Sequence, residues 1–266
     1  MDLLTYSFFV NALWAAILSA IICGIMGTYI VTKRIVFISG GITHASFGGI
    51  GIGYYFGINP ILGAAVFAVL SALGIEYSSR KTDIREDSAI AILWALGMAV
   101  GVIFVFITPG YAPNLLSYLF GNILTVSATD LYLLLGLAVI IAVLFMLQYK
   151  NILYIAFDEE YARARRLPVN MIKYLMISLI ALTIVFNIRV VGIILVISLL
   201  TIPQTIANMF VKKFIGIMIL SVAIALLGTI TGLILSYLFN IPSGASIIFF
   251  LVILFFLARI LKMFVK

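Results

Sequence analysis

Charged side chains are scarce in this sequence: they make up 9% of its 266 residues, whereas hydrophobic residues make up 65%. Soluble domains carry about 25% charged residues, so this chain cannot cover a water-facing surface of normal size. Near-continuous apolar runs recur along the whole sequence, and each is long enough to cross a hydrocarbon core of roughly 30 Å. The sequence therefore predicts an all-α polytopic membrane protein embedded in a lipid bilayer.

Cysteine and catalytic residue clusters are also rare. The single cysteine, Cys23, lies inside the first apolar run, so no disulfide framework is expected and packing is its simplest role. The sequence contains no serine–histidine–aspartate group, no paired carboxylates within a span and no nucleotide-binding motif. These absences disfavour a membrane-embedded enzyme. We expect a single transmembrane domain over 1–266, and any ATP-driven transport would need an ATPase on another chain.

The apolar runs predict about nine membrane-spanning helices, and eight to ten remain possible because 115–129 can be read as a further short helix or partial span. With the N-terminus outside and the C-terminus in the cytoplasm, Arg189 alone of the 16 basic residues falls on the outer side. This distribution obeys the positive-inside rule. The net charge of +7 therefore indicates topology rather than nucleic-acid binding. The runs lie at 7–32, 35–56, 58–78, 87–108, 130–148, 171–188, 191–211, 214–238 and 244–261.

The longest predicted inner loop, about 149–170, contains acidic residues followed by basic residues. That order complements a helix dipole, and Glu159 and Arg163 have the spacing of a stabilising pair. We therefore predict a short helix over 157–167, ended by Pro168. It is either a solvated connector or a docking helix that fits a groove on a soluble partner.

The only histidine, His44, lies in an apolar span among glycines. A histidine there is costly unless it has a partner or faces a water-filled cavity, and its neutral imidazole is the commonest metal ligand. On a helix, Gly40, Thr43, His44, Gly48 and Gly51 share one face, and the small residues permit close helix contact. Two interpretations follow: a ligand that lines a narrow passage, or a histidine hydrogen-bonded within helix packing.

Other polar residues in the spans have mainly structural interpretations. Asp87 and Asp130 begin spans and are expected to complement the helix dipole and cap the helix. Glu76 is expected to snorkel to the inner interface. Pro203 and Gln204 interrupt the seventh span, and proline frees a backbone carbonyl. They predict a pathway lining or hinge, with a simple kink as the alternative.

Four segments of the sequence together point to a known family. They occur in a fixed order and extend over most of the chain: "KRIVFISGGITHASFGGIGIGYYFG" (33–57), "REDSAIAILWALGMAVGV" (85–102), "LLSYLFGNILTVSATDL" (115–131), and "AFDEEYARARRLPV" (156–169) joined to "RVVGIILVISLLTIPQTIA" (189–207). With this order and spacing, the chain resembles the permease subunit of zinc, manganese and iron type ABC importers.

The resemblance implies a type II-like ABC importer permease in a prokaryotic cell (inner) membrane. It implies a homodimer around a central pathway, two copies of a separate ATPase that binds ATP, and an extracytoplasmic metal-binding protein. The cargo would be a divalent transition metal ion, with no permanently bound cofactor. The stretch 157–167 would be the coupling helix received by the ATPase, through Phe157, Asp158, Glu159, Glu160, Tyr161, Arg163 and Arg165.

The sequence departs from the family pattern beside His44. The family usually places an aspartate four residues before the histidine, where this chain has Gly40. His44 is therefore expected to bind metal transiently, with the dimer mate's His44 or nearby hydroxyls completing a weak site. Conduction tolerates weak binding because the ion must leave again. The expected pathway-lining residues are Ser39, Thr43, Ser46, Pro203 and Gln204.

Two other transport classes remain as alternatives. An ABC permease for a metal chelate or vitamin would need a wider pathway. A gradient-driven secondary transporter would normally carry charged residues within its spans for ion coupling, and such residues are nearly absent here.

Overall fold

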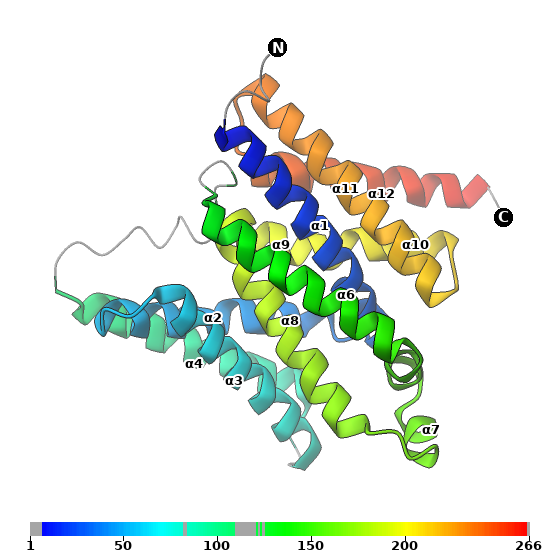
Figure 1. Cartoon of the computed structure of the whole chain (residues 1–266), viewed down its shortest axis with the longest axis horizontal. Coiled ribbons are helices and arrows are strands. Elements are labelled where there is room, and N and C mark those ends of the chain that lie inside the picture. The colour runs from blue at the N-terminus through cyan, green and yellow to red at the C-terminus, as the bar shows by residue number, and fades with distance from the viewer. Residues whose placement is uncertain (1–6, 82–83, 110–120, 122, 124–125, 265–266) are drawn as a thin grey trace. The chain divides into compact units, whose positions relative to one another are not determined.

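The computed structural model describes residues 7–81, 84–109, 121, 123 and 126–264, and these residues form helices joined by short connections, with no β-strand (Figure 1). The helices are α1 (Ser7–Lys33), α2 (Val36–Tyr55), α3 (Pro60–Lys81), α4 (Glu86–Ile107), α6 (Ala128–Phe157), α7 (Glu159–Ala164), α8 (Val169–Val191), α9 (Ile193–Leu199), α10 (Ile202–Phe210), α11 (Phe214–Phe239) and α12 (Ser243–Phe264).

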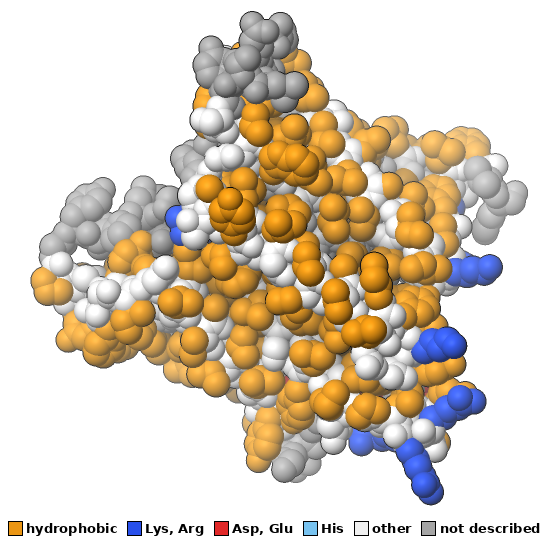
Figure 2. All heavy atoms as spheres, in the orientation of Figure 1, with side chains coloured by type: hydrophobic (Ala, Val, Ile, Leu, Met, Phe, Trp, Pro, Cys, Tyr) orange, Lys and Arg blue, Asp and Glu red, His pale blue; other side chains and the backbone are white. Residues whose placement is uncertain are grey.

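The length and composition of these helices confirm the predicted membrane architecture. Within the described ranges, nine helical segments are long and apolar enough to cross a bilayer, when α9 and α10 are counted as one. Hydrophobic side chains cover most of the face drawn in Figure 2, as expected for a surface in contact with lipid. The predicted short helix or partial span at 115–129 falls mostly outside the described residues.

The chain divides into two compact units. The first comprises Met1–Arg34, Leu116–Leu147 and Asn187–Lys266, and the second comprises Ile35–Leu115 and Gln148–Phe186. Two long helices, α6 and α8, each contribute to both units. The His44 helix and the predicted docking helix therefore both belong to the second unit.

In the second unit α2 packs between α3 and α4 at contacts made by glycine. A β-carbon on Gly49 would overlap the backbone of Gly63 in α3, and one on Gly51 would overlap the backbone of Gly101 in α4. The helix backbones therefore touch directly, as in small-residue membrane helix packing. The predicted close approach of helices to α2 is confirmed.

In the first unit α1 packs against α10 and α11, and α11 packs against α12. Gly232 of α11 lies against Ile247 of α12, and the hydroxyl of Ser246 donates a 2.8 Å hydrogen bond to the carbonyl of Gly232. The seventh predicted span is two short helices, α9 and α10, which are separated by Leu200 and Thr201. The predicted interruption of this span is therefore present.

The fifth predicted span, 130–148, is longer in the structure. Helix α6 bends at Gln148, where φ is −115° and ψ is 15°, and then continues to Phe157. The extension is stable because Ile152, Ile155 and Ala156 return to one face at helical spacing and are buried. The expected inner loop from about 149 to 170 is thus largely helical, and only its centre forms the separate helix α7.

Candidate functional site

His44 lies on α2 and is half-buried. Its ring stacks on the indole of Trp94 from α4, with ring centroids 4.3 Å apart and planes inclined by 4°. Its Nδ1 atom is buried and has no hydrogen-bond partner within the described part of the chain. The histidine is therefore held by aromatic stacking rather than by hydrogen bonds to Nδ1. No sequence pattern indicates Trp94 as its partner, because the contact joins two helices.

Gly40 lies one turn before His44 on the same face of α2. A β-carbon placed on Gly40 would meet no atom within 4 Å. The position normally occupied by the family's aspartate is thus open space rather than a site filled by another side chain. Among the described residues, no group of three or more histidine, cysteine, aspartate or glutamate side chains could hold a metal ion.

The three hydroxyl residues predicted around His44 are fully buried. Ser39 donates a hydrogen bond to the carbonyl of Val36, Thr43 to that of Ser39, and Ser46 to that of Thr43. Each hydroxyl proton is therefore used within α2. The hydroxyl oxygens keep lone pairs, so each can only accept a further hydrogen bond or coordinate a cation.

Gln204 lies at the break between α9 and α10. Its Nε2 atom donates hydrogen bonds to the carbonyl of Cys23 in α1 at 2.8 Å and to the carbonyl of Leu199 at 3.0 Å. Gly27 leaves room for this side chain, because a β-carbon there would overlap the Gln204 amide. Pro203 occupies the first turn of α10. Gln204 thus satisfies a carbonyl freed by the break and ties the broken span to α1.

The predicted docking helix is α7, Glu159–Ala164, which is shorter than the expected 157–167. It begins later because α6 runs to Phe157 and Asp158 is the N-cap, whose side chain accepts a 2.9 Å hydrogen bond from the Tyr161 N–H. It ends before Pro168 because Arg166 adopts a left-handed conformation, with φ of 58°. Both ends are therefore set by caps.

Aromatic and basic side chains surround this short helix. Tyr161 contacts the ring of Tyr154 edge-on, with centroids 5.6 Å apart, and the guanidinium of Arg165 lies 5.5 Å from the Tyr161 ring centroid. The side chain of Phe157 is 62% exposed, and Glu160, Arg163 and Arg165 are also exposed. The segment thus presents an aromatic and charged surface that a soluble protein can contact.

Glu159 contacts a residue that the sequence did not link to it. The Nζ atom of Lys173 in α8 lies 2.8 Å from Glu159 Oε1 and 2.9 Å from Glu76 Oε1 of α3. The expectation that Glu76 snorkels to water is wrong, because its side chain is buried and paired inside the second unit. Arg163, the expected helical partner of Glu159, donates a hydrogen bond to Asn170.

The acidic residues at two span starts differ from each other in detail. Asp130 accepts hydrogen bonds from the N–H and hydroxyl of Ser127, which confirms its capping role, and it pairs with Arg189 at 3.2 Å. Asp87 pairs with Arg85 at 2.9 Å. It lies in the first turn of α4, where Arg85 is the N-cap residue, and its carboxylate accepts a 2.9 Å hydrogen bond from the Ser88 N–H. Asp87 therefore complements the helix dipole and satisfies one first-turn N–H without occupying the N-cap position.

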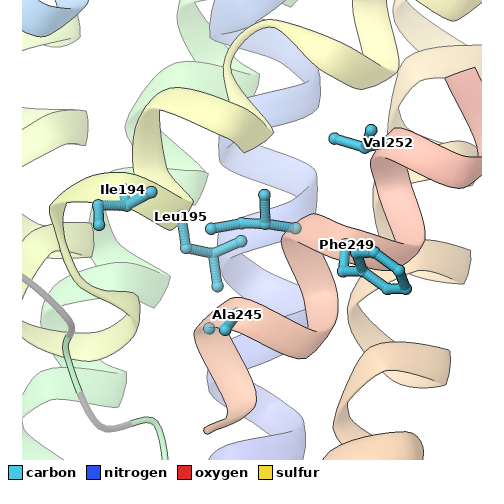
Figure 3. Close-up of a pocket in the computed structure, with 7 residues that line it drawn as sticks. Ile194, Leu195, Ala245, Phe249 and Val252 are labelled. Atoms are coloured by element: carbon cyan, nitrogen blue, oxygen red, sulfur yellow. The ribbon is translucent and has the colours of Figure 1, made fainter.

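An apolar pocket of about 330 Å³ lies between α9 and α12 in the first unit (Figure 3). Ile194, Leu195, Ala245, Phe249 and Val252 surround it in the view of Figure 3. None of these side chains offers a coordinating atom. The pocket therefore suits a hydrocarbon group, and it is not a candidate metal site.

Three comparisons with known proteins agree with one another. Residues 5–262 match the model of the family described as "ABC 3 transport family". An uncharacterised membrane protein of Synechocystis sp. is 45% identical over 245 residues, which cover 92% of this chain and 87% of that protein. The manganese transport system membrane protein MntC of Halalkalibacterium halodurans is 36% identical over 257 residues, which cover 97% of this chain and 88% of that protein.

A solved structure has the same fold. PsaBC from Streptococcus pneumoniae, determined in complex with Fab, contains a chain that matches with a TM-score of 0.86 and 30% sequence identity. The match covers 96% of this chain and 92% of that chain.

Proposed function

Because the chain belongs to the ABC 3 transport family, we propose that it is the membrane-spanning subunit of an ATP-driven importer of a divalent transition metal ion. One observation carries the proposal: the similarity to the manganese transport membrane protein of H. halodurans extends over 97% of this chain. Manganese is therefore the first cargo to test, with zinc and iron as alternatives. The chain acts as a permease, and the ATP would be hydrolysed by another subunit.

The proposed complex contains two copies of this chain and two copies of a separate ATPase. An extracytoplasmic binding protein delivers the metal. The N-terminus lies outside and the C-terminus in the cytoplasm of a prokaryotic cell, which accords with the placement of the 16 basic residues. Under this arrangement α7 lies on the cytoplasmic side. The exposed Phe157 at the end of α6 and the charged residues of α7 support a role of this segment as the surface received by the ATPase.

His44 is the proposed transient metal ligand. Two features support this role: the Nδ1 atom has no hydrogen-bond partner among the described residues, and the space beside it at Gly40 is open. A single imidazole without a carboxylate holds a cation weakly, which favours release. Thr43 lies nearest to the His44 face of α2 and is the hydroxyl best placed to add an oxygen, and a second His44 from the dimer mate can add a further nitrogen. Ser39 and Ser46 are fully buried on the opposite side of α2, so any role of theirs in the pathway is through packing.

Two variants separate a ligand role for His44 from a packing role. In proteoliposomes that contain this chain, its ATPase and its binding protein, we expect His44→Ala and His44→Phe both to lower ATP-dependent uptake of labelled manganese by about tenfold or more, which is about 1.4 kcal/mol. His44→Phe keeps a ring to stack on Trp94 but has no nitrogen ligand. Recovery of uptake by phenylalanine would assign His44 to packing alone.

The same vesicles test the proposed function as a whole. Uptake of manganese should require the ATPase and ATP, and zinc and iron serve as competing cargoes. Uptake that follows an ion gradient and ignores ATP depletion would identify a secondary transporter. Uptake of a chelate or vitamin, with no uptake of the free ion, would identify the wider ABC permease class.

A further inference from the structure

Three charged side chains from separate helices of the second unit meet at a largely buried position. Lys173 Nζ lies 2.9 Å from Glu76 Oε1 and 2.8 Å from Glu159 Oε1. The exposed fractions of the side chains are 14% for Lys173, 9% for Glu76 and 26% for Glu159. One ammonium group is therefore shared by two carboxylates, one from α3 and one from α7.

The burial of these charges makes the contacts hard to separate. Removing one partner of a buried ion pair leaves an uncompensated charge, which is far more destabilising than loss of an exposed pair. If α7 moved away from α3, Lys173 could stay paired with only one of the two carboxylates. The other, either Glu76 or Glu159, would lose its positive partner. The cluster thus favours movement of α3, α7 and the start of α8 as one body.

The short helix α7 is rigid enough to act through this cluster. Asp158 caps its first turn, and Tyr161 is held between Tyr154 and Arg165. Glu159 projects from the same turn into the cluster. A push on the exposed face of α7 therefore reaches Lys173 without first deforming the helix.

Helix α3 in turn contacts the helix that carries His44. The backbones of Gly63 in α3 and Gly49 in α2 touch with no side chain between them, and Gly49 follows His44 by little more than one helical turn. A shift of α3 toward α2 therefore displaces backbone near the proposed ligand. The chain of contacts runs from α7 through Lys173 and Glu76 to α3 and α2.

We propose that Lys173 is a positioning residue that joins α7 to α3 and thereby transmits force from the ATPase to the His44 helix. This inference rests on the proposed function, because it takes α7 as the surface that receives the ATPase. Lys173 contacts neither the metal nor the ATP. Its loss should uncouple hydrolysis from transport while leaving the ATPase bound.

The test compares variants in the reconstituted complex of this chain with its ATPase and binding protein. The readouts are ATPase binding by co-elution, the rate of ATP hydrolysis, and the number of manganese ions transported per ATP. Coupling between distant sites typically corresponds to roughly 5- to 150-fold. We expect Lys173→Met to bind the ATPase and to reduce manganese transported per ATP by about fivefold or more, whereas Lys173→Arg should keep the ratio.

A second variant and a matched control guard against misfolding. Glu76→Gln preserves side-chain size and leaves a neutral Lys173–Glu159 pair, and we expect it to lower the same ratio. Arg85→Gln breaks the ion pair of Arg85 with Asp87 in the same unit, whose side chains are 82% and 59% exposed. In this control the number of manganese ions transported per ATP should stay at the wild-type value.

Three results would overturn the inference. The first is an unchanged ratio in Lys173→Met or Glu76→Gln, and the second is an equal loss in Arg85→Gln. The third is failure of both Lys173→Met and Glu76→Gln to assemble while Lys173→Arg assembles, which would make the cluster a folding requirement only. A wild-type complex that moves no metal with ATP would refute the proposed function as well.

Discussion

Replacing Gly40 by aspartate is the most informative single change, because it would restore the carboxylate that the chain lacks. The structure can accept it, since a β-carbon at Gly40 meets no atom within 4 Å. Residues four apart on a helix have β-carbons about 5–6 Å apart. The new carboxylate and the His44 imidazole could therefore bind one cation together.

Three terms set the size of the effect. A carboxylate in the centre of a membrane helix costs roughly 2.5–3.5 kcal/mol, and this is an upper bound for position 40, which is only the fifth residue of α2. At an effective dielectric constant of about 20, unit charges 4 Å apart attract by about 4 kcal/mol, so a divalent cation attracts the carboxylate by about 8 kcal/mol. The attraction exceeds the cost of the carboxylate, and dehydration of the cation removes part of the difference. We expect Gly40→Asp to tighten metal binding by at least about tenfold, or about 1.4 kcal/mol.

Uptake kinetics in proteoliposomes are the assay. Tighter binding should lower KM for manganese, and slower release should lower the maximal rate, because conduction needs weak sites. Gly40→Asn has nearly the same size without the charge and is the control. A combined Gly40→Asp and His44→Ala variant should lose most of the gain. Equal KM values for Gly40→Asp and Gly40→Asn would refute the reasoning about a shared cation.

Three further variants test the framework around the site. Gly121→Ala should lower the free energy of unfolding by more than about 2 kcal/mol, because φ at Gly121 is +61° and a β-carbon there would overlap the Gly192 backbone. Gly136→Ala is the control, because a β-carbon at Gly136 would meet no atom within 4 Å, and it should leave stability unchanged. Thermal unfolding in detergent compares the two variants. Gln204→Leu should cost about 1–2 kcal/mol in the same assay through two lost hydrogen bonds, and unchanged stability would contradict the bracing role. Asp158→Ala should cost about 1 kcal/mol of α7 stability and weaken ATPase co-elution, and retained affinity would argue against α7 as the docking surface.

The membrane architecture could be predicted from the sequence because apolar run length alone determines whether a helix can cross a bilayer. A short helix at α7 could likewise be predicted, since acidic residues followed by basic residues form a local pattern, but that pattern did not identify Asp158 as its N-cap. The end of α6 was missed because Tyr149 and Lys150 resemble a span boundary. Burial of Ile152 and Ile155 by other helices overrides that signal.

The partners of the site residues could not be predicted because they come from distant parts of the chain. Nothing in the sequence near His44 indicates Trp94, and nothing near Glu159 indicates Lys173. Gln204 stands out in the sequence as a polar residue in an apolar span, but its side chain donates to the backbone carbonyl of Cys23, and every residue type carries a backbone carbonyl. Hydropathy identifies helices, whereas these pairings depend on which faces meet after folding.

The contact of Gly49 with Gly63 has a consequence for how this protein can change over generations. Any missense change in either codon introduces at least a methyl group between two touching backbones, so neither position has a mild replacement. Phe106 of α4, with an exposed fraction of 89%, can exchange for other apolar residues without such a conflict. Genetic drift should therefore be confined to the outer faces of the helices, while the glycine contact between α2 and α3 tolerates almost no variation.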